Sequence, residues 1–170
     1  MIPRKIWPWM LLAACWAGPS PAVEPFELFT ESEAAQWTTA PKEPTDFSTR
    51  DLADDHGAPT CHSTPDNDAD NPQIRILTPT LGKTLTPPLD LDLLFTPTAS
   101  APIRPDTFRL CYLGSVAIDL TKRITDRVTV SEKGLRVSGV RLPHGTHRLV
   151  LLIADQRGRL GRREAVFNID

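Results

Sequence analysis

The fold is decided by the end of the chain, where residues 142–170 read LPHGTHRLVLLIADQRGRLGRREAVFNID. The first half of this stretch alternates with the period of a β-strand, and apolar Val150 and Leu152 on its second face predict that both faces are at least partly covered. A turn follows at residues 155–158, whose glycine is free to adopt a positive φ. A second alternating run ends at Ile169, so we expect a closing β-hairpin.

The same alternation recurs in short runs upstream of this hairpin. Residues 89–95 alternate apolar with mostly acidic side chains, and residues 108–112 alternate again. Further strands are expected near residues 74–76, 116–118, 128–130 and 135–140, with a loop over 79–88 and a polar loop over 119–126. Seven or eight short strands separated by Gly and Pro predict an all-β fold, an antiparallel β-sandwich over residues 73–170.

Two motifs in this region resemble bacterial Ig-like domains of the fibronectin III and cadherin-like kind. P-x-I-x-I-x-x-P-x-x-G, beginning at Pro72, is similar to their opening strand. G-x-H, beginning at Gly145, followed by alternating aliphatics and by D-x-x-G from Asp155, is similar to their closing hairpin. The resemblance implies an Ig-like sandwich that acts as a spacer, adhesive or docking unit, and it contributes no catalytic residues.

The first residues of the chain are typical of an export signal. Arg4 and Lys5 precede an apolar run that is far shorter than the roughly 20 residues of a membrane-spanning helix. Residues 12–15, LAAC, resemble a bacterial lipobox, whose cysteine receives diacylglycerol. We expect removal of residues 1–14 as a signal peptide and a lipid anchor at Cys15 that holds the chain in the periplasm, on the cell membrane or outer membrane. A secretory signal with an incidental cysteine is the alternative.

Residues 15–72 form an acidic arm rich in Pro and Asp, which we expect to be largely irregular. Residues 16–72 carry two basic and twelve acidic side chains, whereas the chain from Gln73 onward carries 15 basic and nine acidic ones. A short helix is expected near residues 31–37, because Thr30 and Glu33 have capping-box spacing. This helix is too short to be stable alone. Either its apolar residues dock on something or the segment is a tether.

Two cysteines remain after Cys15 is assigned to the lipobox. Cys61 lies in the arm and Cys111 in a predicted strand. In an oxidising compartment they can form a disulfide that joins the arm to the sheet. Closing a loop of about 50 residues stabilises the fold by ~4 kcal/mol in the chain-entropy model. Two free thiols are the alternative.

A metal-dependent activity is the alternative to a non-enzymatic module that binds a partner. His144 and His147 flank a turn and could both reach one ion, but no third ligand stands at a predictable spacing. Asp66, Asp68 and Asp70 alternate as calcium ligands do, without the Gly and Glu of an EF-hand loop. They are weak candidates, and we expect no resident metal or cofactor.

The candidate binding residues are four arginines in and after the turn of the closing hairpin: Arg157, Arg159, Arg162 and Arg163. Clustered guanidinium groups recognise phosphate and carboxylate in bidentate geometry. No nucleophile elbow or phosphate-cradling glycine loop is present, so we expect no catalytic residues and no small-molecule substrate. We expect an exported, non-enzymatic module that binds an envelope protein or an anionic envelope polymer, not nucleic acid. The alternatives are a metal-dependent envelope enzyme or accessory, and a pure spacer.

Overall fold

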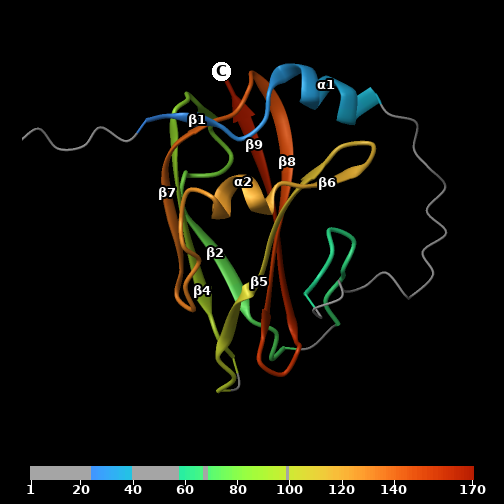
Figure 1. Ribbon diagram of the computed structural model, residues 1–170, viewed down its shortest axis with the longest axis vertical. Helices are drawn as coiled ribbons and strands as arrows, with labels where there is room; N and C mark the ends of the chain where they lie inside the picture. The colour runs from blue at the N-terminus through green and yellow to red at the C-terminus, as the bar shows by residue number, and fades with distance from the viewer. Residues whose placement is uncertain (1–23, 40–57, 67–68, 99) are drawn as a thin grey trace, which may run out of the picture.

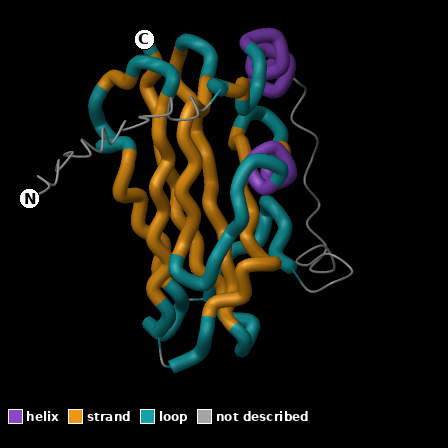
Figure 2. The backbone as a smooth tube through the Cα atoms, turned by 60° about the vertical axis from the view of Figure 1, so that its left-hand side comes forward, coloured by secondary structure: helices purple, strands orange, loops and turns teal. Residues whose placement is uncertain are grey.

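The computed structural model describes residues 24–39, 58–66, 69–98 and 100–170 of the 170-residue chain. Two β-sheets pack face to face over these residues, and both helices lie on one side of the strands (Figures 1 and 2). The expected all-β sandwich is therefore confirmed. The signal sequence, Cys15 and Asp68 lie outside the described residues. Within the described part, no helix is long and apolar enough to cross a membrane.

One sheet has four strands in the order β1-β7-β4-β2. Their bounds are β1 Phe26–Glu27, β7 Gly134–Arg141, β4 Leu89–Thr96 and β2 Gln73–Thr78. The other has five strands in the order β3-β9-β8-β5-β6. Their bounds are β3 Thr84–Leu85, β9 Leu160–Ile169, β8 Gly145–Asp155, β5 Ile103–Leu113 and β6 Ala117–Asp119. The pairs β1–β7 and β3–β9 are parallel, so the sandwich is not wholly antiparallel as expected.

The core lies between the two sheets and follows the period of two. Inward residues of β4, such as Leu93 and Phe95, face inward residues of β8, such as Leu151 and Ile153, and all four are buried. The long β8–β9 pairing runs from Gly145 opposite Ile169 to Ala154 opposite Leu160, as the hairpin prediction required. The resemblance to Ig-like domains stays a prediction.

Three expectations about the middle of the chain are wrong. Residues 128–130 form no strand. Val128 and Val130 pack against the core, but this run pairs with no strand in the described part of the chain. The expected loop over residues 119–126 contains a short helix, α2, at Thr121–Thr125. Ile124 of α2 is fully buried, so an apolar anchor inside a polar run decided the local structure. The expected loop over 79–88 likewise contains β3, which pairs with the end of the chain in β9. No local sequence pattern predicts this pairing.

The start of the acidic arm belongs to the sandwich. Helix α1 spans Glu31–Thr39 and begins with the expected capping box, in which Thr30 N–H donates to the Glu33 carboxylate at 2.8 Å. Just before it, Leu28 and Phe29 are only 2% and 1% exposed in the main core. Of the two alternatives for this segment, the structure has the docked one.

A second part of the arm covers the outer face of the five-stranded sheet. Cys61 and Cys111 form a disulfide with their Cα atoms 5.7 Å apart, which confirms the predicted pairing. Cys111, Val150 and Leu152 are fully buried on this face, and Cys61 packs against them. This cover explains why β8 is apolar on both faces.

Candidate functional site

The candidate binding residues lie at opposite ends of the sandwich. The β8–β9 turn, which carries the arginines, lies at the bottom of Figure 1, whereas the C-terminus and α1 lie at the top. His144, in the turn before β8, lies near the C-terminal end, because Gly145 pairs with Ile169. The arginines and histidines therefore belong to two separate candidate sites.

A buried carboxylate organises the arginine end. Asp155 is 0% exposed, and its Oδ1 accepts hydrogen bonds from the backbone N–H groups of Arg157 at 2.8 Å and Arg159 at 3.0 Å. Its Oδ2 accepts from Nε of Arg159 at 2.8 Å. Burial opposes the charged form, but these hydrogen bonds outweigh it and hold the pKa of Asp155 below its usual range. Arg159 therefore stabilises the β8–β9 turn through its hydrogen bonds to Asp155.

The four arginines divide into two pairs. Arg159 is held by Asp155, and Arg162 lies 2.7 Å from the Glu164 carboxylate. Arg157 and Arg163 are exposed, and among the described residues neither guanidinium group has an ion-pair partner. Of the four arginines predicted to bind anions, only Arg157 and Arg163 thus have guanidinium groups that no described carboxylate engages. Sequence spacing could not make this division, because it depends on where the carboxylates lie.

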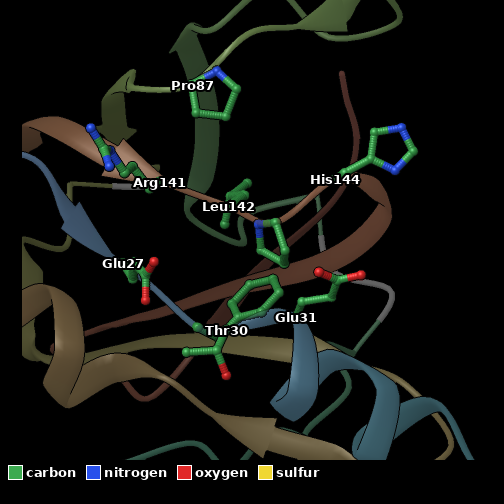
Figure 3. Close-up of a pocket in the computed structure, with 9 residues that line it drawn as sticks. Glu27, Thr30, Glu31, Pro87, Arg141, Leu142 and His144 are labelled. Carbon is green, nitrogen blue, oxygen red and sulfur yellow. The ribbon is translucent and has the colours of Figure 1, made fainter.

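At the other end, a groove of about 450 Å³ opens between the β1–α1 segment and the turn before β8 (Figure 3). Glu27 and Arg141 lie toward one side of it, and Glu31 and His144 toward the other. Its full lining is Glu27, Phe29, Thr30, Glu31, Pro87, Arg141, Leu142, Pro143 and His144. Of these, only His144 is a site candidate predicted from the sequence, because the groove exists only once the arm docks.

The structure separates the two histidines by environment. His144 is exposed in the groove, whereas His147 is 4% exposed and its ring lies 5.1 Å from that of Phe29. Nε2 of His147 donates to the Pro143 carbonyl oxygen at 2.9 Å. In the described part of the chain, no three His, Cys, Asp or Glu side chains group closely enough to hold a metal ion. The structure thus places the two histidines in different environments, and a metal-dependent role for the pair stays an alternative prediction.

The aspartate string is engaged with the protein where the structure describes it. Asp66 accepts a hydrogen bond from Asn71 Nδ2 through its backbone oxygen at 2.6 Å. The Asp70 carboxylate lies 3.5 Å from Arg159. Since Asp68 is outside the described residues, the alternating set is not seen together. Asp70 is thus a second carboxylate, besides Asp155, that forms an ion pair with Arg159. This contact does not support a calcium site.

The described residues define a class, an all-β sandwich whose N-terminal arm is docked on one end and joined to the sheet by a disulfide. No protein-family model matches the chain, and no curated protein matches it either. Among solved structures, the chain is similar to an endo-β-1,4-mannanase from Thermotoga petrophila, with 10% identity and a TM-score of 0.41 over 61% of this chain and 21% of that chain. A likeness this weak carries no argument about fold or activity.

Proposed function

We propose that this chain is an exported, non-enzymatic β-sandwich module, anchored at Cys15, that binds or positions an anionic component of the cell envelope. The observation that carries the binding part is the division of the arginines: Arg159 and Arg162 are paired, and Arg157 and Arg163 are exposed without an ion-pair partner among the described residues. Guanidinium groups that no internal carboxylate holds can make bidentate hydrogen bonds to phosphate or carboxylate groups.

The disulfide supports the exported part of the proposal. Cys61–Cys111 joins segments 50 residues apart in the chain. Stable disulfides are rare in reducing compartments and common outside the cytoplasm. The measurement is the mass of the mature protein from the envelope, with a thiol-alkylating reagent, before and after reduction. We expect two thiols to become reactive only after reduction, and two free thiols before reduction would contradict export to an oxidising compartment.

The docked arm favours a binding module over a pure spacer. Fully extended, all 58 residues of the expected arm, 15–72, would span roughly 200 Å. Since β1 joins the sheet at Phe26, only ten residues lie between it and Cys15, a reach of at most about 40 Å. The arm thus holds the sandwich close to the proposed anchor, and the arginine end lies at the far end of the sandwich from β1 (Figure 1).

The test compares two double variants of equal charge loss. Arg157→Ser with Arg163→Ser removes the exposed arginines of the hairpin end. Arg75→Ser with Lys83→Ser removes two exposed cations from β2 and from the loop before β3. The mature protein is sedimented with isolated anionic cell-wall polymer and with vesicles containing phosphatidylglycerol.

We expect the hairpin variant to bind the polymer roughly tenfold more weakly, because each exposed charge contact contributes up to about 1 kcal/mol. The control variant should bind as the unaltered protein does. Added salt should weaken the unaltered protein further, since exposed charges are screened. Equal binding by both double variants would remove the hairpin end from the proposal, and binding to vesicles alone would replace the polymer by the lipid surface.

A further inference from the structure

Four aromatic rings join the β1–α1 segment to the five-stranded sheet. Phe29 and Trp37 come from the segment, Tyr112 from β5 and His147 from β8. The Phe29 ring lies 5.1 Å from both Tyr112 and His147 and 5.6 Å from Trp37, centroid to centroid. Trp37 is 5.3 Å from Tyr112. The imidazole is therefore part of the surface on which the segment docks.

The hydrogen bonds of His147 assign its protonation state. Nε2 lies 2.9 Å from the Pro143 carbonyl oxygen, which only accepts, so Nε2 carries the hydrogen. Nδ1 is buried and has no hydrogen-bond partner among the described residues. The ring is thus neutral when the segment is docked. A second proton, on Nδ1, would find no acceptor among the described residues.

None of the described ionisable groups around this ring would stabilise a positive charge on the imidazole. His144, in the same turn, carries a like charge when protonated and so opposes a charge on His147, and Tyr112 contacts the imidazole through its ring. From the arm, α1 presents Trp37 to this cluster. The Glu33 carboxylate of α1 is engaged by Arg123 of α2 at 2.7 Å. No described carboxylate is paired with the imidazole.

We infer that His147 is an acid-sensitive latch, which holds the segment Phe26–Thr39 on the end of the sandwich and opens when the imidazole takes up a proton. The imidazolium needs water or an acceptor at Nδ1, and the packing around this buried atom, to which the Phe29 ring belongs, must open to admit either. Phe29 and Pro143 both line the groove of Figure 3, and His147 contacts both. Opening the latch therefore also opens the groove. This inference does not depend on the proposed function.

The direction of the pH effect follows from burial. Burial is the largest cause that lowers the pKa of His147 below its ordinary value of 6.5, and His144 lowers it further. The open form therefore binds the proton more tightly, and its population increases as the pH falls below about 6.5, by at most tenfold per pH unit. The increase stops below the pKa of the closed form. Arg123 holds the pKa of Glu33 at about 2, so that ion pair stays charged throughout this range.

Hydrogen exchange of the full mature protein tests the latch. Two reporters are the amide of Leu28, which donates to Arg141, and the amide of Ala34, which donates to Thr30. Exchange is measured at pH 7.5 and 5.5 and corrected for the intrinsic rate at each pH. The corrected rates of these amides should increase several-fold at pH 5.5, while those of β8 stay unchanged.

Three variants separate the latch from general acid sensitivity. His147→Phe keeps a ring without a titrating nitrogen, and His147→Gln keeps a polar side chain; both should abolish the pH dependence of the two reporters. His144→Asn should retain it. The inference would be overturned if the exchange rates of the two reporters did not depend on pH in the unaltered protein, or if both His147 variants kept the pH dependence of the unaltered protein. Two substitutions of different size at His147 guard against a failure of one to fold.

Discussion

Replacing Phe29 by alanine should destabilise the whole sandwich. Phe29 is 1% exposed and contacts three aromatic rings within 5.6 Å. Phe→Ala substitutions in cores cost about 3–5 kcal/mol, and the loss of edge-to-face partners places this one in the upper half of that range. Losing the Phe29 ring should thus remove a large fraction of the free energy of unfolding of a typical domain.

Urea unfolding at pH 7.5, where His147 is neutral, measures this cost through the free energy of unfolding and its m-value. Phe26→Ala is the control, because Phe26 is only half-buried and lies against exposed Arg127. We expect a loss of no more than about 1 kcal/mol for that control. A loss below about 1 kcal/mol for Phe29→Ala would show that undocking of the segment at pH 7.5, with the latch closed, costs too little free energy for Phe29 to stabilise the sandwich, and would refute the reasoning.

Two further predictions concern the disulfide and the arginine end. Cys61→Ser combined with Cys111→Ala should lower the free energy of unfolding by ~4 kcal/mol, measured by urea titration against the oxidised protein, and an unchanged midpoint would contradict it. Asp155→Asn should cost about 3 kcal/mol, because Arg159 loses its buried partner. Since the pKa of Asp155 is lowered, its stabilisation is present above about pH 4 and lost as the pH falls. Thermal unfolding from pH 6 to 2 should therefore show a smaller loss of stability in the variant than in the unaltered protein, because the variant keeps only the loss from other carboxylates, such as Glu33.

Local patterns predicted most of the sandwich strands. Alternation identified β4, β8 and β9, because one face of each must be apolar to meet the core. It failed at Val128 and Val130, which alternate in the same way but pack on the core without a partner strand among the residues that the structure describes. It also missed β1 and β3, since each has two residues and exists only through pairing with distant strands.

The candidate sites show the same division. Spacing identified the arginine-rich turn, the histidine turn and the cysteine pair, because each is a local accumulation of one chemistry or a count of residues. It could not say that Asp155 binds Arg159, nor that His147 lies under Phe29. These contacts join residues whose relation depends on strand register and on the docked arm.

The amino-acid order was therefore sufficient for the two apolar sheet faces and the capping box of α1. It offered the pairing of Cys61 with Cys111 beside the alternative of two free thiols, and the structure decided between them. Which arginines stay free, and whether the arm is a tether or part of the core, were decided only by tertiary packing. The physical reason is that periodicity records which side of an element is buried. The partner that buries it lies in another part of the chain, and no local signal specifies that partner.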